Sequence, residues 1–449
     1  MLVQQYQMEL FIDNNKRKNG FCAEWGTFKD NLRAPIHRWF TYPAGFSYKA
    51  VEAGIRTYNI KPGQIIYDPF MGTGTTNLTA KIKGINSFGI EAHPFVFPIA
   101  KTKLNIEINL KNIYELSEAL YKEFSLIKIP KKGLLDKLEK EFPELVLKCY
   151  NYETLYQLLF IRNTISDIDA HSSVRDFLIV ALTSILREVS SVQTGWPYIA
   201  PNKSKNGLKT INAFETFINK IYSMAKDVST VKCKMNGIKS NHEIYESDSR
   251  NTAKYFESES VDFVFTSPPY LNNFDYADRT RLEMYFFKKA LCWSDITEKV
   301  RSKLITSATT QINRSDSKYE LDKRIKYDCK EVYDFLLTSK NQLEKLRNMK
   351  GGKKSYDLMV SGYFNDLYLV LKDVFRVMKK KSFALFILGD SAPYGVHIPT
   401  DELIGKLGVS IGFSNYHISI LRTRGGKWKD NPQRHNVGLR ESVVTLKKS

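Results

Sequence analysis

Hydrophobic and polar positions follow two different periods near the start of the chain. Residues 45–58 carry apolar side chains at helical spacing, whereas GQIIYDPF (63–70) is a short apolar run that predicts a strand. A glycine turn and a helix follow at MGTGTTNLTAKIKG (71–84), and NSFGIEA (86–92) predicts a second strand before a further helix. This order of strands and helices is typical of a parallel sheet covered by helices, so the pattern predicts an α/β fold.

The alternation then stops for more than a hundred residues. Residues 110–232 have helical periodicity, which predicts an insertion of four or more helices. A loop rich in proline, aromatic residues and lysine is expected at TGWPYIAPNKSKNG (194–207). Strand-like sequence resumes at HEIYESDS (242–249) and again at VDFVFTSPPY (261–270), so we expect both segments to join the first two strands in one sheet.

The C-terminal part returns to strong apolar patterns after a polar region. Residues 295–355 are polar and basic, with few strong apolar runs. A helix is predicted at 363–380 and a strand at 382–390. The final segment, from residue 415 onward, predicts a hairpin of two strands around a basic loop.

Composition adds a partner class to this picture. The 449 residues carry a formal net charge of +19, with a pI near 9.4, which favours a polyanionic partner such as nucleic acid; the alternative is a generally basic surface. The five cysteines form no CxxC pair, and no histidine lies at ligand spacing to them, so we expect no structural metal. The N-terminus lacks the layout of a signal peptide, and the longest apolar runs are of strand length, so a cytoplasmic protein without a membrane span is expected.

The segment DPFMGTGTT (68–76) is the first candidate for binding chemistry. A glycine turn between a strand and a helix brings backbone N–H groups close to a ligand, and Gly72 and Gly74 permit that approach. The spacing matches neither GxGxxG nor GxxxxGK, which disfavours a nicotinamide cofactor and a nucleoside triphosphate. Glu91, at the end of the next strand, can accept the two ribose hydroxyls of a nucleoside cofactor, and its alternative role is that of an acid at a helix N-terminus.

Two later segments complete the series of candidates. Asp248 follows the third strand, where a carboxylate can accept from an adenine amino group, although it could be an ordinary loop residue. The strand before Ser267 then runs into two consecutive prolines and Tyr270. Such a corner is rigid and nearly free of backbone donors, and its simplest interpretation is a proline turn that ends a strand.

Together these motifs resemble those of S-adenosylmethionine-dependent amino DNA methyltransferases, in which Asp, Asn or Ser precedes Pro-Pro and an aromatic residue. The similarity covers residues 40–110 and 242–290 well, and 360–449 by architecture. It implies a Rossmann-like methyltransferase sheet and S-adenosyl-L-methionine as the cofactor. The cofactor-binding residues that it implies are Asp68, Phe70, Gly72, Gly74, Thr75, Glu91 and Asp248.

The resemblance also implies a mechanism at SPPY (267–270). The Ser267 hydroxyl and the Pro268 carbonyl would accept hydrogen bonds from an exocyclic base amine, with Pro269 fixing the corner. Tyr270 would offer its ring to a base that has left the duplex. Family members with SPPY mostly methylate cytosine N4, so a cytosine-N4-specific enzyme is expected. The alternatives are methylation of adenine N6, methylation of an RNA base, and DNA binding by an inactive relative of these enzymes.

Double-stranded DNA is the expected partner, and a cognate restriction endonuclease is a further candidate. Target recognition is predicted in residues 272–360 together with the C-terminal basic loop, rather than in the helical insertion. The candidate DNA-binding residues are Arg279, Arg422, Arg424, Lys427, Lys429 and Arg434. The predicted parts are the cofactor half (1–109), the insertion (110–240), the catalytic part (241–292), the recognition insertion (293–360) and the C-terminal part (361–449).

Overall fold

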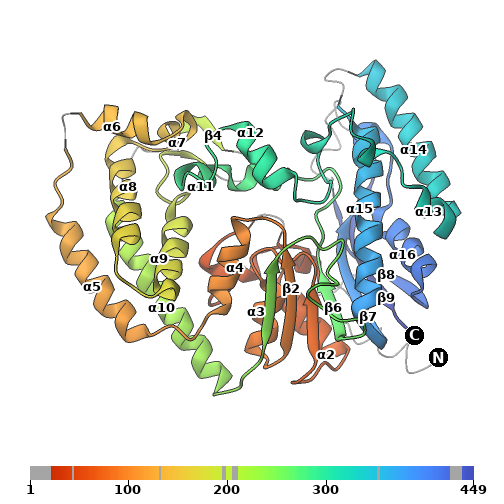
Figure 1. Cartoon of the computed structure of the whole chain (residues 1–449), viewed down its shortest axis with the longest axis horizontal. Helices are drawn as coiled ribbons and strands as arrows, with labels where there is room; N and C mark the ends of the chain where they lie inside the picture. Colours follow the sequence, from red (N-terminus) through yellow and green to blue (C-terminus); the bar gives the residue numbers. More distant parts are fainter. Residues whose placement is uncertain are drawn as a thin grey trace.

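Seven strands form one mixed sheet in the computed structural model, in the order β5-β2-β1-β6-β7-β9-β8 (Figure 1). The first five pair in parallel, whereas β9 runs antiparallel to both β7 and β8. The strands are β1 (Ile65–Asp68), β2 (Asn86–Glu91), β5 (His242–Glu246), β6 (Val261–Thr266), β7 (Met378–Gly389), β8 (Asn415–Arg424) and β9 (Leu439–Lys447). The described residues are 22–42, 45–130, 133–194, 199–204, 211–350, 354–424 and 437–449. The predicted α/β fold and its terminal hairpin are confirmed.

Helices cover both faces of this sheet because parallel strands are apolar on both sides. On one face, α2 (Tyr48–Thr57) buries Ala50 and Val51 against Phe263 and Phe265 of β6. On the other face, α15 (Tyr356–Val377) packs on the inner strands and α16 (Thr400–Ile411) packs on β8 and β9. The other α-helices described before the insertion are α3 (Thr75–Ile82) and α4 (Val96–Leu104).

The helical insertion forms a lobe beside the sheet, drawn from orange through yellow to yellow-green in Figure 1. Its elements are α5 (Leu110–Leu126), α6 (Leu134–Glu141), α7 (Glu144–Cys149), α8 (Tyr152–Asp167), α9 (Ser172–Ile185), α10 (Ala213–Met235) and the short strands β3 (Val192–Gln193) and β4 (Ala200–Ser204). The predicted helices are confirmed, but β4 lies in the segment predicted as a loop. The core of this lobe also takes in α11 (Arg281–Phe286) and α12 (Trp293–Ile296) from the later sequence.

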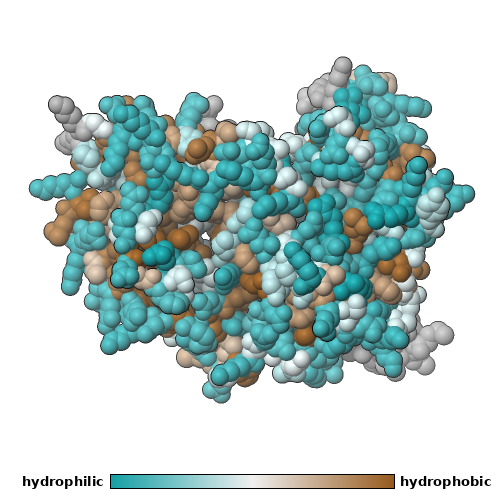
Figure 2. Space-filling view, in the orientation of Figure 1, coloured by the Kyte–Doolittle hydropathy of each residue, from teal (hydrophilic) through white to brown (hydrophobic). Residues whose placement is uncertain are grey.

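The polar region of the C-terminal part is largely helical. It contains α13 (Lys323–Asp328) and α14 (Lys330–Met349), and short helical turns η5 to η7 lie between residues 297 and 319. The helix α15 begins at Tyr356 rather than at 363, and α16 was not predicted. The α16 segment has acidic residues in its first turn and ends at Gly412, both of which are ordinary helix signals. Figure 2 shows a largely hydrophilic surface, indented between the helical lobe and the α14 side.

One buried carboxylate anchors the helical lobe to the segment before the sheet. Asp227 of α10 accepts hydrogen bonds from the Ile36 N–H, the Trp39 indole N–H and two nitrogens of Arg38, at 2.7–3.1 Å. Its side chain is only 4% exposed, so the four donors replace the water that this charge would otherwise bind. Among the described residues, no helix is long and apolar enough to cross a membrane.

We expect Asp227→Ala to lower the free energy of unfolding by about 3 kcal/mol, because it leaves buried donors without an acceptor. Urea unfolding followed by circular dichroism measures this change. The control is Asp176→Ala on the exposed side of α9, which should change the unfolding free energy by less than about 0.5 kcal/mol. Equal losses in the two variants would contradict the anchoring role of Asp227.

Candidate active site

A cavity lies where the carboxyl ends of β1, β2, β5 and β6 meet. Parallel strands bring their carboxyl ends to one edge of a sheet, and ligands commonly bind there. Most residues predicted for the cofactor and for catalysis line this cavity, although they are far apart in the sequence. These are Phe70, Gly72, Thr75, Glu91, Asp248, Ser267 and Pro269.

The glycine turn has the geometry that its sequence predicts. Gly72 and Gly74 adopt positive φ angles of 54° and 81°, which side chains rarely tolerate. The turn is held to β2, because the Met71 N–H donates to the Ile90 carbonyl at 3.0 Å. Gly74 is the residue immediately before α3, so the turn leads directly into the helix N-terminus beside the cavity.

Asp68 lies beneath the turn rather than on the cavity wall. Its side chain is fully buried, and Oδ1 accepts from the Phe70 N–H at 3.0 Å and from the Thr266 hydroxyl at 2.6 Å. Burial raises the pKa of this carboxyl to about 6. The predicted direct contact between Asp68 and a cofactor is therefore replaced by a positioning role. Asp68 joins the glycine turn to the residue that precedes SPPY.

Glu91 is a buried carboxylate on the cavity wall. It accepts from the Gly72 N–H at 2.7 Å and from the His93 N–H at 2.8 Å. Burial raises its pKa to about 7, although these backbone donors act in the opposite direction. His93 is also buried, and its Nε2 lies 2.8 Å from the hydroxyl of Thr280, beyond the SPPY corner. The end of β2 is thereby connected to the segment that follows the corner.

At the SPPY corner, Ser267 and Pro269 line the cavity and Pro268 is buried. The Ser267 hydroxyl donates its proton to the Ile387 carbonyl on β7, at 3.1 Å. This donation leaves the lone pairs of the Ser267 oxygen available to accept a hydrogen bond.

Tyr270 does not offer its ring to the cavity as predicted. The side chain is 5% exposed, and its hydroxyl donates to Glu441 of β9 at 2.8 Å. The Arg424 guanidinium lies 5.5 Å from the centre of the ring. Other aromatic rings line the cavity instead, among them Tyr42 and Tyr276, whose centroids are 6.4 Å apart. Only the tertiary structure distinguishes these rings from core aromatics.

Three of the predicted DNA-binding arginines have partners inside the protein. Arg279 is 7% exposed and lies over the Phe274 ring, with 4.7 Å between the guanidinium carbon and the ring centre. Arg422 is paired with Glu441, and Arg424 donates to the Asp390 carbonyl at 2.6 Å. These contacts hold the chain around SPPY in place. Because Arg279 is buried, the prediction that it binds DNA is corrected. Lys427, Lys429 and Arg434 lie outside the described residues.

Sequence reasoning missed one wall of the cavity. Residues 303–307 contribute Lys303, Leu304, Ile305 and Ser307 to the lining. They belong to a polar stretch without a recognisable motif, so no pattern in the sequence marks them. Phe28 and Phe46 also line the cavity, and neither was among the predicted site residues.

The comparisons with known proteins point to one class of enzyme. A family model described as DNA methylase matches residues 4–102. The chain is 28% identical to the Type II methyltransferase M.BsoBI of Geobacillus stearothermophilus, over 94% of this chain and 87% of that protein. It is 24% identical to M.AvaI of Nostoc sp. (98% and 92% covered) and to M.MvaI of Kocuria varians (91% and 87% covered). These matches make the chain similar to amino DNA methyltransferases of restriction–modification type and support an S-adenosylmethionine-dependent enzyme of that class.

The bond between Thr266 and Asp68 predicts a pH-dependent loss of stability in Thr266→Val. Above pH 6 the buried carboxyl is ionised and the hydroxyl donates to a charge, so its removal should cost about 2 kcal/mol. The loss should be smaller at pH 5, because the raised pKa leaves Asp68 largely protonated there.

Urea unfolding at pH 5 and pH 7.5 measures this difference. The matched control is Thr423→Val on β8, whose side chain is exposed and should show no pH-dependent loss. A loss in Thr266→Val that is the same at both pH values would exclude an ionised Asp68 as the acceptor.

Proposed function

We propose that the protein transfers a methyl group from S-adenosyl-L-methionine to the exocyclic N4 amine of cytosine in double-stranded DNA. The observation that carries this proposal is the position of Ser267. Its hydroxyl lies on the wall of the cavity that also contains the glycine turn, Glu91 and Asp248. The group proposed to accept from the base and the groups proposed to hold the cofactor therefore line one cavity.

The chemistry of the cavity fits a nucleoside cofactor. Glu91 holds a carboxylate at the end of β2, where two ribose hydroxyls could donate to it, and Asp248 follows the neighbouring strand β5. The left-handed turn at Gly72 permits close approach of the backbone. The DNA methylase family generally uses S-adenosylmethionine, which supplies an electrophilic methyl group on a positively charged sulfur.

The SPPY corner would prepare the amine of the target base. The lone pair of an exocyclic amine is delocalised into the ring, which makes the nitrogen a poor nucleophile. Hydrogen bonds from the amine to the Ser267 oxygen and the Pro268 carbonyl would favour a tetrahedral nitrogen. Because the prolines and the bond from Ser267 to Ile387 fix these acceptors in advance, little reorganisation is needed during the reaction.

Two features support the choice of DNA and of cytosine. The relatives are Type II methyltransferases, and the net charge of +19 suits a polyanionic substrate. A target base must leave the duplex to enter a cavity at the sheet edge.

The neutral Ser267 stands where other members carry Asp or Asn, and SPPY members mostly methylate cytosine N4. A partner endonuclease that reads the same DNA sequence is part of this proposal.

The product identifies the target base directly. Unmethylated bacterial genomic DNA is incubated with the protein and methyl-tritiated S-adenosylmethionine, digested to nucleosides and analysed by mass spectrometry. We expect the label in N4-methylcytosine. Label only in N6-methyladenine would establish the alternative base, and label only in 5-methylcytosine would overturn amine methylation altogether.

Ser267→Ala should lower turnover by roughly 10²- to 10³-fold, because one fixed acceptor for the amine is removed. Binding of S-adenosylhomocysteine, measured by calorimetry, should stay within about twofold, since this change leaves the acidic cofactor contacts intact. The matched control is Ser260→Ala, just before β6 at the opposite edge of the sheet, which should keep wild-type turnover. Wild-type turnover in Ser267→Ala would remove Ser267 from the proposed mechanism.

A further inference from the structure

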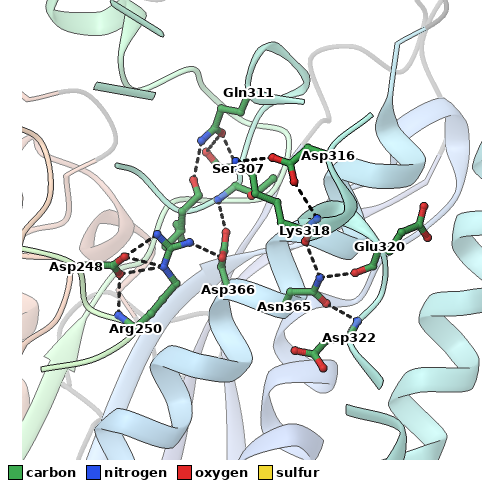
Figure 3. A network of polar contacts seen from close by, with 12 residues as sticks. Asp248, Arg250, Ser307, Gln311, Asp316, Lys318, Glu320, Asp322, Asn365 and Asp366 are labelled. Atoms are coloured by element: carbon green, nitrogen blue, oxygen red, sulfur yellow. Dashed lines mark hydrogen bonds and ion pairs between the residues drawn. The ribbon is translucent and has the colours of Figure 1, made fainter. Parts of the chain in front are cut away.

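The helix α15 holds a polar segment, residues 303–322, through the side chains of three residues. Asp366 accepts from the Thr306 N–H at 2.7 Å (Figure 3). Asn365 accepts from the Asp322 N–H at 2.9 Å and donates to two carbonyls of the same segment. Asp357 forms a two-pronged ion pair with Arg314. Hydrogen bonds therefore order a segment that has few apolar residues.

The beginning of this segment is the cavity wall that sequence reasoning missed. The Ser307 carbonyl accepts from the Asn272 N–H at 2.8 Å, two residues beyond the SPPY corner. Gln311 accepts from the N–H groups of Ser307 and Ala308, at 2.8 and 3.0 Å. The wall is thus attached on one side to the corner and on the other side to α15.

Arg250 connects that wall to the predicted cofactor carboxylate. Its Nε lies 2.9 Å from both oxygens of Asp248, and its Nη2 lies 2.6 Å from Oδ2 (Figure 3). Its Nη1 donates to Oδ1 of Asp366 at 2.6 Å, while Oδ2 of Asp366 accepts from Thr306. A continuous series of hydrogen bonds therefore runs from Asp248 through Arg250 and Asp366 to Thr306, which lies between the lining residues Ile305 and Ser307.

Arg250 is bonded to both Asp248 and Asp366, so the orientation of the Asp248 carboxylate depends on Asp366. A carboxylate has about four lone-pair positions, and the Arg250 side chain and its backbone N–H occupy most of those of Asp248. The Arg250 guanidinium is planar and holds its N–H donors in a rigid fork. It therefore determines which lone pair of Asp248 is left to accept a hydrogen bond from a ligand. The same guanidinium is held from the other side by Asp366, whose side chain is 13% exposed.

We propose that Arg250 and Asp366 are positioning residues that couple the cofactor end of the cavity to its wall at Thr306 and Ser307. Binding at Asp248 then stabilises the wall, and the ordered wall in turn strengthens cofactor binding. The coupling is reciprocal, as linkage requires. This inference rests on the proposed function, because it assigns Asp248 to the cofactor.

The test measures cofactor binding in a variant that lies away from the cavity lining. Asp366→Asn removes the charge that holds Arg250, and Asp366 does not line the cavity. We expect about 5- to 20-fold weaker binding of S-adenosylhomocysteine by calorimetry, within the usual range of coupling between sites. The matched control is Asp357→Asn, which weakens another contact between α15 and the segment, and should change the affinity less than twofold.

Hydrogen–deuterium exchange separates coupling from a purely structural role. In the wild type and in Asp357→Asn, saturating S-adenosylhomocysteine should slow amide exchange in residues 303–311. In Asp366→Asn the same saturation should leave that exchange unchanged. A merely structural Asp366 would lower the melting temperature but retain the ligand-induced protection. Arg250→Lys provides a second variant that keeps the charge, loses the fork and should show the same loss of protection.

Two outcomes distinguish this inference from the proposed function. Wild-type affinity and wild-type protection in both Asp366→Asn and Arg250→Lys would overturn the coupling alone. No binding of S-adenosylhomocysteine by the wild type would overturn the cofactor assignment, and with it the coupling.

Discussion

The buried carboxylate of Asp68 is the interaction on which the site depends. It ends β1, beneath the glycine turn, and accepts from Phe70 of the turn and from Thr266 of the adjacent strand β6. A buried charge is stable only where it is hydrogen-bonded, so the two strand ends are held in one arrangement. The turn and the corner that carries Ser267, both of which line the cavity, thereby keep a fixed separation.

Polar connections of the same kind surround the cavity. Glu91 fixes the turn from β2, and Glu441 on β9 accepts from both Tyr270 and Arg422 behind the corner. Such groups bring directionality that apolar packing lacks, which matters where a methyl group must be transferred in line. The apolar helices α2 and α15 supply the stability that allows the edge of the sheet to be this polar.

The helical lobe and the C-terminal helices lie on two sides of the edge of the sheet that carries the cavity (Figure 1). The lobe is anchored by Asp227, and its core extends into α11 and α12, which follow the SPPY corner in sequence. The segment before α13 is instead attached to α15. The residues after SPPY thus pass from one side of the cavity to the other, and several of them form its wall.

Local pattern was sufficient for most elements, and the family resemblance then marked the candidate residues of the site. Apolar runs mark the strands, and the glycines mark the turn, because these preferences act over a few neighbouring residues. The carboxyl-edge rule then brings Glu91, Asp248 and Ser267 together, as the structure also does. The missed helix α16 had ordinary end signals, so that error lay in interpretation rather than in the sequence.

Long-range contacts decided what the sequence could not. Asp68 and Tyr270 have motif positions that suggest ligand contact, yet their partners, Thr266 and Glu441, bury them. Arg279 has the charge of a phosphate ligand, but its side chain is buried and its guanidinium lies over the Phe274 ring. Residues 303–307 carry no motif, and long-range bonds hold them at the cavity, from Asn272 to the Ser307 carbonyl and from Thr306 to Asp366 of α15. The sequence by itself determined the elements and the chemical groups of the site, because both reside in short segments. Only the tertiary structure decided which groups face the cavity, because burial depends on residues distant in the chain.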